Sequence, residues 1–318
     1  MRKKNVLIAV LLVFLVIAFL VIFNLVSKGE INQGNNQISE KAKGIMILIE
    51  YKDIDGLKNF ATEMEERNIK GLLTVTPEFV TANCSDIKKV MGQGIEIVPS
   101  NVKEAFWGIS YEEQKETIIA MKKEVEACTN VPVRMISSRY MASDMVTLQV
   151  ADELGIPYIL ARGTTDTKAT VYEVEDYNTK ILSVSNIPIA TFKYGSLCDY
   201  SFFVRSGTPG DMRAELDRAL EPLTDKEKVR YGSNHKVTPV SQTWIGGALK
   251  PWNDMWLNFW DESTDKVEWA SLDEFMADSD WVLPLWQVPI NRNAPYTPEK
   301  LKPLTSFEDV EKVENMCK

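Results

Sequence analysis

Short apolar runs alternate along the chain with segments in which apolar residues recur every three or four positions. Runs of the first kind are typical of buried strands, and segments of the second kind are typical of amphipathic helices. The strand-like runs lie at residues 44–50, 70–76, 95–98, 133–136 and 156–160, and the helix-like segments at 53–68, 85–94, 110–128 and 145–155. This alternation predicts an α/β domain whose parallel sheet is covered by helices, either an open doubly wound sheet or a closed barrel.

The carboxyl ends of the predicted strands are the first place to look for a site, because both architectures bind ligands there. These strands end near Glu50, Thr76, Val98 and Ile136. The turns that follow contain neither GxGxxG nor GxxxxGK. Without such glycine-rich phosphate-binding motifs, the commonest nucleotide-binding domains are excluded.

The N-terminal segment has a different pattern, because only Asn24 interrupts an apolar run at residues 6–26. As a helix, this run is long enough to cross a bilayer. Neither a small-x-small cleavage site nor a cysteine for lipidation follows it, so we predict an uncleaved transmembrane anchor, with a cleaved signal peptide as the alternative. Basic residues at positions 2–4 place residues 1–5 in the cytoplasm. The predicted localisation is the cell membrane, single-pass, with the C-terminal domain extracytoplasmic.

The remaining chain divides by composition. Residues 27–43 are polar and rich in Gly and Asn, which predicts a tether. Residues 44–290 are predicted to form one large domain, in which 164–237 is an insertion that shapes the pocket, and residues 291–318 a proline-rich tail packed on that domain. The net charge of −9 argues against nucleic acid as a partner, because phosphate binding relies on clustered Lys and Arg.

The cysteines Cys84, Cys128, Cys198 and Cys317 are widely spaced and form no CxxC pair. A thiolate zinc site or a redox pair is therefore not expected. Outside the cytoplasm disulfides are permitted, but their connectivity cannot be deduced from spacing, and a domain of this size does not need them. We predict that most of these residues are buried free thiols.

The order and content of the segments resemble the polysaccharide deacetylase (NodB-homology) family. The resemblance covers residues 44–165 and, more faintly, 237–276. It is carried by the spacing from IMILIEYKD to KGLLTVTPEFV, by IKKVMGQGIEIVPSN, by the helix that begins at ISYEEQ, and by VPVRMISSRY followed by VTLQVADELGIPY. It implies an α/β fold of the distorted (β/α) barrel type, preceded here by the transmembrane helix, and removal of N-acetyl or O-acetyl groups from envelope glycans with a divalent metal.

The positions of the family's metal ligands carry other residues in this chain. The first motif of the family ends a strand with two aspartates, a general base and a metal ligand, and these positions are Glu50 and Tyr51. The second motif has two histidines four residues apart, and the loop GIEIVPSNVKEA has Ser100 and Glu104 there. Zinc favours imidazole, thiolate and carboxylate donors. We therefore predict no cofactor, or a weakly held divalent cation if the protein is active.

The third and fourth motifs also depart from the family pattern. The third, an Arg-Pro-Pro-Tyr segment that orients the base, is Ser-Ser-Arg-Tyr here, so Tyr140 matches and Arg139 is close enough in sequence to reach the same pocket. The histidine of the fourth motif should follow the strand in VTPVSQTW, which contains none. His235, the only histidine of the chain, precedes that strand and is predicted to be a loop residue.

Seven of the eight tryptophans lie beyond residue 240. Trp252, Trp256 and Trp260 recur every four residues and would share one face of a helix. We predict that this face packs against the barrel. A stacking platform for sugar rings, with Trp244 and Trp252 as substrate-binding residues, and a contact with lipid headgroups are the alternatives.

These patterns and the resemblance predict a membrane-anchored, extracytoplasmic, deacetylase-like protein of cell-envelope carbohydrate metabolism. It would recognise an envelope glycan and be noncatalytic or catalytically altered, because the Asp-His-His ligands are missing. The alternative is a divergent active deacetylase in which Glu50 is the base and Arg139 or Tyr140 stabilises the oxyanion. A structural or protein-interaction role is the third possibility, predicted if side chains fill the pocket.

Overall fold

The computed structural model describes residues 41–101, 105–162, 168–187, 195–231 and 234–284. They belong to one compact unit that begins at Lys41. No helix in these ranges is long and apolar enough to span a membrane. The predicted anchor at 6–26 and the predicted tail at 291–318 lie outside the described residues.

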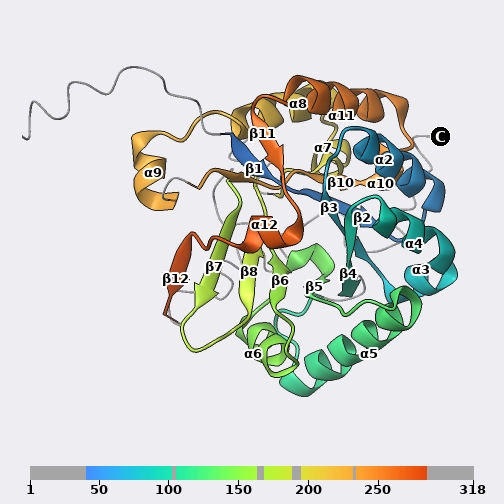
Figure 1. Ribbon diagram of the computed structural model, residues 1–318, viewed down its shortest axis with the longest axis vertical. Coiled ribbons are helices and arrows are strands. Elements are labelled where there is room, and N and C mark those ends of the chain that lie inside the picture. The colour runs from blue at the N-terminus through green and yellow to red at the C-terminus, as the bar shows by residue number, and fades with distance from the viewer. Residues whose placement is uncertain (1–40, 102–104, 163–167, 188–194, 232–233, 285–318) are drawn as a thin grey trace, which may run out of the picture. The chain divides into compact units, whose positions relative to one another are not determined.

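The main sheet has nine strands among the described residues, in the order β10-β2-β3-β4-β5-β6-β8-β7-β12 (Figure 1). Neighbouring strands are parallel except for the antiparallel pair β7 and β8. The sheet curls into a half-barrel, which is the form that the predicted distorted barrel takes. The strands are β2 (Met46–Glu50), β3 (Gly71–Val75), β4 (Ile95–Asn101), β5 (Met135–Ser138), β6 (Tyr158–Ala161), β7 (Thr170–Val174), β8 (Lys180–Ser183), β10 (Val240–Gln242) and β12 (Trp281–Leu283).

A second, smaller sheet has three strands, in the order β11 (Val267–Trp269), β1 (Ala42–Gly44) and β9 (Lys236–Val237). β1 directly precedes β2, and β9 precedes β10, so two chain segments run from the small sheet into the large one. Because residues 42 and 43 belong to β1, the tether predicted for residues 27–43 must end before Ala42.

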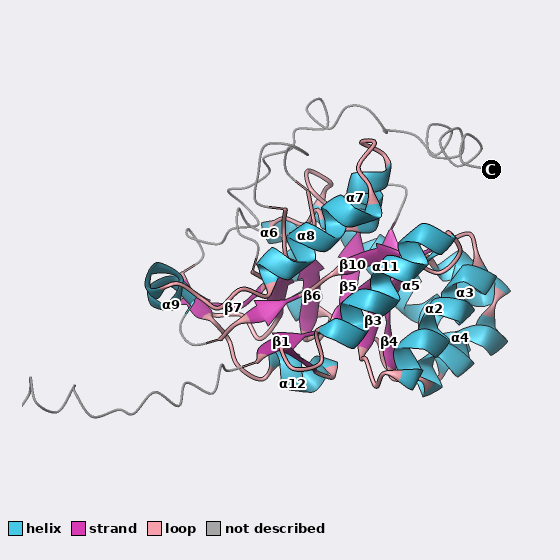
Figure 2. Cartoon of the chain, turned by 90° about the horizontal axis from the view of Figure 1, so that it is seen from above, coloured by secondary structure: helices cyan, strands magenta, loops and turns pink. Residues whose placement is uncertain are grey.

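Helices cover the outside of the main sheet. Figure 2 shows α2, α3, α4 and α5 as one group beside β3 and β4. Capping side chains mark two of the helix starts: Asp53 accepts hydrogen bonds at the start of α2, and Ser110 with Glu113 forms the capping box of α5. The helices are α2 (Ile54–Glu66), α3 (Pro77–Ala82), α4 (Cys84–Gly92), α5 (Tyr111–Thr129), α6 (Met145–Glu153), α7 (Asp199–Phe203), α8 (Pro209–Ala219), α9 (Asp225–Tyr231), α10 (Thr243–Gly246), α11 (Lys250–Glu262) and α12 (Leu272–Met276), with the 3-10 turn η1 (Arg139–Met141).

The central strands are buried on both faces, which explains their continuous apolar sequences. In β2, Met46 and Leu48 enter the core between sheet and helices, whereas the neighbouring Ile47 enters a second core inside the curl. Side chains from strands all around the sheet fill this inner core: Ile47, Leu72, Val98, Met135, Leu160, Val171, Leu182 and Val240.

A short segment at residues 196–198 connects the two sides of the curl. Ser196 forms an antiparallel bridge with Asn186, just after β8, and Cys198 forms a parallel bridge with Val240 of β10. The backbone N–H of Val240 also donates to the Leu197 carbonyl at 2.8 Å. The region predicted as an insertion thus supplies part of the main framework.

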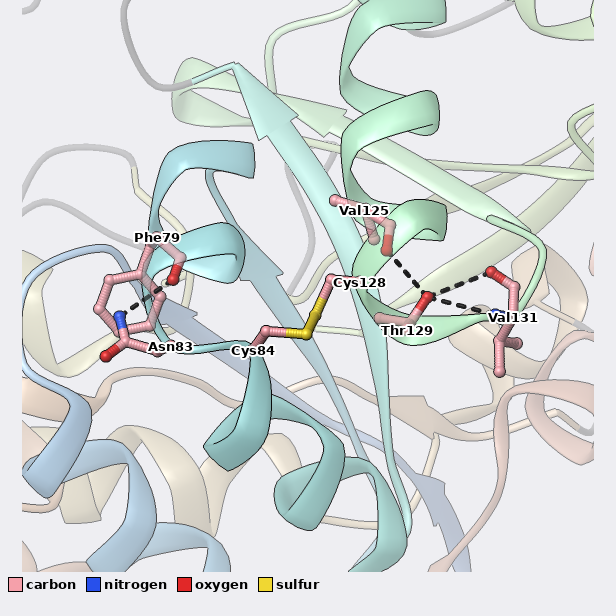
Figure 3. The surroundings of a disulfide bond; sticks show 7 residues. All are labelled: Phe79, Asn83, Cys84, Val125, Cys128, Thr129 and Val131. Carbon is pink, nitrogen blue, oxygen red and sulfur yellow. Dashed lines mark hydrogen bonds between the residues drawn. A yellow bond between two sulfur atoms is a disulfide. The ribbon is translucent and has the colours of Figure 1, made fainter.

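Cys84 and Cys128 form a disulfide that joins the start of α4 to the end of α5 (Figure 3). Their Cα atoms are 5.7 Å apart. Cys198 is a buried free thiol, and Cys317 lies outside the described residues. The prediction of mostly free thiols is therefore wrong for Cys84 and Cys128, because folding brings together two helix ends that are far apart in sequence.

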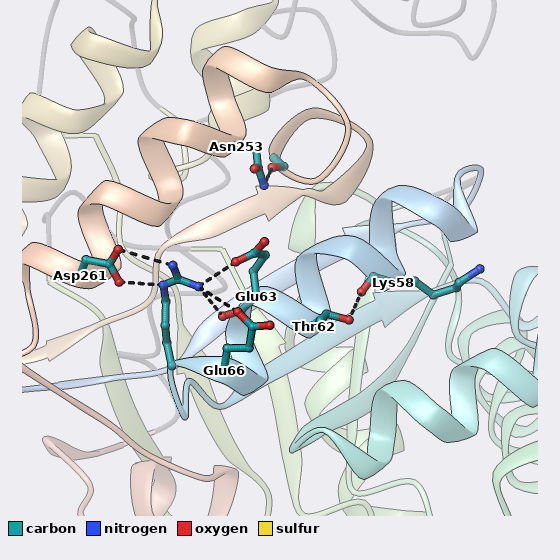
Figure 4. A network of polar contacts seen from close by, with 8 residues as sticks. Lys58, Thr62, Glu63, Glu66, Asn253 and Asp261 are labelled. Atoms are coloured by element: carbon teal, nitrogen blue, oxygen red, sulfur yellow. Dashed lines mark hydrogen bonds and ion pairs between the residues drawn. The ribbon is translucent and has the colours of Figure 1, made fainter.

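Helix α11 packs its aromatic face into the outer core, as predicted. Trp252, Trp256 and Trp260 are 5%, 0% and 1% exposed. The Phe60 ring of α2 lies 4.9 Å from that of Trp260, measured between ring centres. On the surface, Arg67, the C-cap residue that follows α2, pairs with Asp261 at 2.8 Å, within the polar network shown in Figure 4. The two helices are held together by the buried rings, since an exposed ion pair contributes little.

Candidate functional site

The carboxyl ends of β2, β3 and β4 lie at one edge of the sheet, here called the carboxyl edge. Strand pairing places Glu50 level with Val75, and Val75 level with Pro99. Ser100 is therefore one residue beyond this level and two strands from Glu50, which corresponds to about 10 Å at ordinary strand spacing. The structure thus brings these two predicted site positions to the same edge.

The next strand brings the third motif to the carboxyl edge. Ser100 pairs with Ser137 of β5, and Arg139 and Tyr140 follow directly after the strand. Glu104 lies outside the described residues. Four of the predicted positions, Glu50, Ser100, Arg139 and Tyr140, therefore surround the ends of β2, β4 and β5.

Glu50 is completely buried, and both of its carboxylate oxygens are hydrogen-bonded within the fold. Its Oε1 accepts the backbone N–H groups of Tyr51, Lys52 and Asp53 at 2.8, 2.8 and 2.9 Å. Its Oε2 accepts the Thr243 hydroxyl at 2.6 Å. The side chain therefore closes the turn between β2 and α2 and fastens that turn to the start of α10.

Burial raises the pKa of Glu50, and its four hydrogen bonds lower the pKa in part. A general base needs a carboxylate oxygen within hydrogen-bonding reach of the proton that it removes. In this structure both oxygens are directed at protein donors. Glu50 has the contacts of a structural carboxylate, and its role as a base stays a prediction.

The described residues at the family's metal positions do not fit a divalent cation. Tyr51 and Ser100 present hydroxyl groups in place of the carboxylate and imidazole donors that zinc takes. The Lys52 ammonium lies 5.7 Å from the centre of the Tyr51 ring, and its positive charge disfavours a cation there. In the part of the chain that the structure describes, no group of three or more His, Cys, Asp or Glu side chains could hold a metal.

The turn Arg139–Met141 after β5 has a strained backbone. Tyr140 and Met141 both have left-handed backbone angles, with φ of 60° and 54°. Such angles cost about 1–3 kcal/mol for a residue other than glycine and occur mainly at functional sites. Met141 is buried, whereas Tyr140 is 40% exposed and has the Arg139 guanidinium 4.9 Å from its ring centre. The strained turn therefore presents an aromatic ring at the carboxyl edge.

The loop after β4 is hydrogen-bonded to the segment that follows this turn. The N–H of buried Phe106 donates to the Ala142 carbonyl at 3.1 Å. The N–H of Gly108 donates to the Asp144 carboxylate at 3.0 Å. Trp107, between these two anchors, is partly exposed. It is the one tryptophan outside the C-terminal cluster, and its sequence gave no motif that would have identified it.

A buried network holds both segments in place. The amide nitrogen of Gln114 donates to the Phe106 carbonyl at 2.8 Å and to Asp144 at 3.2 Å. The Thr147 hydroxyl donates to the amide oxygen of Gln114 at 2.7 Å, and its N–H donates to Asp144 at 3.1 Å. Because Gln114 belongs to α5 and Thr147 to α6, two helices fix the geometry of these loops.

Asp199 is a buried carboxylate that sequence reasoning missed. It accepts the N–H groups of Tyr200 at 2.7 Å and Gln242 at 2.9 Å. It also accepts the Ser241 hydroxyl and, at 3.2 Å, the Trp256 indole N–H. Burial raises the pKa of Asp199 to about 6, although these donors lower it in part. A single aspartate in SLCDYSFF carries no signal, because Ser241, Gln242 and Trp256 lie more than forty residues away in sequence.

Trp244 and Trp252, the predicted substrate-binding tryptophans, are 9% and 5% exposed. The Trp244 indole N–H donates to the side-chain oxygen of Gln242 at 2.7 Å. Both indoles pack edge-on against Phe203, with ring centres 5.4 and 6.1 Å away. Little of either ring is available for stacking in this arrangement, and their substrate role stays a prediction.

His235 lies in a loop, as predicted, beside the end of α8. Its Nε2 is 2.8 Å from the Ala219 carbonyl, which also accepts a hydrogen bond from the Lys168 ammonium at 2.8 Å. Burial, together with the charge of Lys168, lowers the pKa of His235 to about 4, although the hydrogen bond to Ala219 and the charge of Glu227 oppose this. His235 is therefore a neutral structural residue near pH 7.

Replacing His235 by asparagine is expected to remove part of the acid sensitivity of folding. The pKa of His235 is about 4 in the folded state and 6.5 in the unfolded state. As the pH falls, the unfolded state therefore binds the proton first. The contribution of His235 is complete above pH 6.5 and is lost between 6.5 and 4, by about 3 kcal/mol. Urea unfolding of both proteins across this range measures the difference, and parallel pH profiles would contradict it.

The curled parallel sheet with this arrangement of helices is the fold of the polysaccharide deacetylases, which confirms the fold that the sequence resemblance implied. A Mycobacterium smegmatis structure described as a polysaccharide deacetylase matches with a TM-score of 0.57 and 12% identity, over 75% of this chain and 91% of that one. A Pseudomonas aeruginosa PAO1 structure of the same description matches with a TM-score of 0.57 and 11% identity, over 80% and 93% of the two chains.

A Puue allantoinase also matches, with a TM-score of 0.55 and 12% identity, over 80% of this chain and 92% of that one. No family model and no curated protein matches the sequence. Since an allantoinase shares the fold with the deacetylases, the fold alone does not define the activity, and the function must be argued from the site.

Proposed function

We propose that this protein binds a glycan of the cell envelope at its carboxyl edge and does not hydrolyse it. The observation that carries this proposal is the bonding of Glu50, which stands at the position of the family's base. Its two carboxylate oxygens accept four hydrogen bonds from the protein, three from backbone N–H groups and one from the Thr243 hydroxyl. The hydroxyl side chains of Tyr51 and Ser100 at the metal positions give further support, because they are poor ligands for the cation that would activate water.

Aromatic side chains at the carboxyl edge support binding of a saccharide. Tyr51, Trp107 and Tyr200 are partly exposed, and Tyr140 is exposed. Aromatic rings offer flat apolar faces with polar edges, which match the apolar faces and hydroxyl groups of sugar rings. They follow β2, β4, β5 and the bridging segment, so they lie around the same edge.

We further propose that the chain is a single-pass membrane protein whose domain lies outside the cytoplasm. The apolar run at residues 6–26 and the basic residues before it support this topology. The Cys84–Cys128 disulfide supports an oxidising compartment, because cytosolic reductants keep most thiols reduced.

Titration of the full-length chain in detergent with chito-oligosaccharides and soluble peptidoglycan fragments tests this proposal. Acetate release is measured in the same samples, with and without added divalent metal. We expect saturable binding to at least one of these glycans and no acetate above the level of a protein-free control. Metal-dependent acetate release would contradict the noncatalytic role, and no binding to either glycan would contradict the glycan role.

A further inference from the structure

We propose that Trp107 and Tyr140 together form a stacking platform for one saccharide ring, and we call this pair the aromatic platform. The inference rests on the proposed glycan-binding function and assigns that function to specific residues. It gives Tyr140 a binding role in place of the oxyanion role considered from sequence. It also assigns a role to Trp107, in the loop where the family pattern would place a metal ligand pair.

The backbone brings the two residues together at the carboxyl edge. Phe106 and Gly108, on either side of Trp107, bond to Ala142 and Asp144, at 3.1 and 3.0 Å. The loop containing Trp107 and the segment just after Tyr140 therefore run side by side. Both aromatic residues are accessible, since Trp107 is partly exposed and Tyr140 is 40% exposed.

Opposite burial of neighbouring residues shows how the chain turns these two rings toward solvent. Phe106 and Met141 are buried, whereas the adjacent Trp107 and Tyr140 reach the surface. At this turn, Tyr140 and the following Met141 both adopt left-handed backbone angles, although neither is a glycine. Nonglycine residues adopt such angles only where the surrounding structure imposes them, and they gather at ligand-binding sites.

Hydrogen bonds anchor the backbone beside the platform, which favours binding. The Gln114 amide nitrogen holds the Phe106 carbonyl, and Asp144 accepts hydrogen bonds from both Gln114 and Gly108. The Arg139 guanidinium lies over the Tyr140 ring at 4.9 Å and restricts its motion. A preorganised aromatic surface loses little conformational entropy on binding, so more of the stacking energy contributes to affinity.

The test is titration of the full-length chain in detergent with chito-oligosaccharides and soluble peptidoglycan fragments, comparing platform variants with matched controls. We expect Trp107→Ala and Tyr140→Ala each to weaken binding about tenfold, the usual loss for a removed aromatic contact in a well-packed site. Tyr140→Phe retains the ring and is expected to bind within about twofold of wild type.

The controls are partly buried aromatic residues at the opposite edge of the main sheet, where its parallel strands begin. Trp269 pairs with Gly44, just before β2, and Tyr177 lies in the turn that leads into β8. Trp269→Ala and Tyr177→Ala are expected to leave the affinity unchanged. Circular dichroism of every variant verifies that it is folded.

A spectroscopic measurement covers the case in which an alanine variant does not fold. The fluorine NMR signal of Trp107 in fluorotryptophan-labelled wild-type protein, assigned with Trp107→Phe, is expected to shift when the bound glycan is added. If wild type binds glycan but the platform variants bind equally well and this signal does not move, the platform is overturned while the glycan proposal stands. If wild type binds neither glycan, both are overturned.

Discussion

Replacing Glu50 by alanine is expected to lower the free energy of unfolding by about 3–5 kcal/mol. The substitution leaves the N–H groups of Tyr51, Lys52 and Asp53 and the hydroxyl of Thr243 without their acceptor. Glu50 is completely buried, so water cannot easily take its place. Urea unfolding of the wild type and the variant measures this difference.

Glu50→Gln is the matched control for this prediction. The amide oxygen of glutamine can still accept the three backbone N–H groups, and its NH₂ group can face the Thr243 oxygen. Burial raises the pKa of Glu50, which means that the fold already disfavours its charge. We therefore expect Glu50→Gln to cost about 1 kcal/mol. An alanine variant as stable as wild type would show that these hydrogen bonds do not hold the turn.

Reduction of the Cys84–Cys128 disulfide is expected to lower the free energy of unfolding by about 4 kcal/mol. The two cysteines are 44 residues apart in sequence, and closing a loop of this length removes much conformational entropy from the unfolded chain. Urea unfolding with and without a phosphine reductant measures the effect. A chain with both cysteines replaced by alanine should match the reduced wild type and no longer respond to the reductant.

Cys198→Ala provides the control for the disulfide prediction. Cys198 is a buried free thiol, so its loss should leave the response to reductant intact. Equal stability of the oxidised and reduced wild-type protein would contradict the predicted effect. It would also remove one argument for an oxidising compartment.

The local elements of the fold could be predicted because their signals lie within short segments. The continuous apolar run at Met46–Glu50 reflects burial on both faces of β2, and the Ser110–Glu113 pair reports the start of α5. The predicted tether extended two residues into β1, because the sequence AKG at residues 42–44 has no strand pattern. Only its pairing with β11 and β9 makes this segment a strand. Local patterns therefore predicted β2 to β6 and the helices α2, α4, α5 and α6, but not how the small sheet assembles.

Features that depend on distant contacts could not be predicted. The bridge between Cys198 and Val240, which connects the two sides of the curl, joins segments with no shared pattern. The same holds for Asp199, which accepts hydrogen bonds from Tyr200 of its own helix α7, from Gln242 of β10 and from Trp256 of α11. Pairing of Cys84 with Cys128 likewise depends on how α4 and α5 pack.

For the candidate site, sequence placed the residues but not their bonding. Glu50 and Tyr140 lie at the carboxyl edge where the resemblance placed them. One carboxylate oxygen of Glu50 is bonded by the following turn and the other by Thr243 of α10, and this follows from side-chain geometry, which sequence does not contain. Trp107 was missed because its neighbours show no binding motif, and only its anchoring by Phe106 and Gly108 makes it notable.

The most direct test of a noncatalytic, glycan-binding domain compares wild type with Glu50→Gln at equal protein concentration. Each is titrated with the glycan that wild type binds, and acetate release is followed in parallel with divalent metal present. We expect affinities within about twofold of each other, because Glu50 does not contact the ligand, and no acetate from either protein. Acetate released by wild type but not by Glu50→Gln would contradict it and identify Glu50 as the base of an active deacetylase.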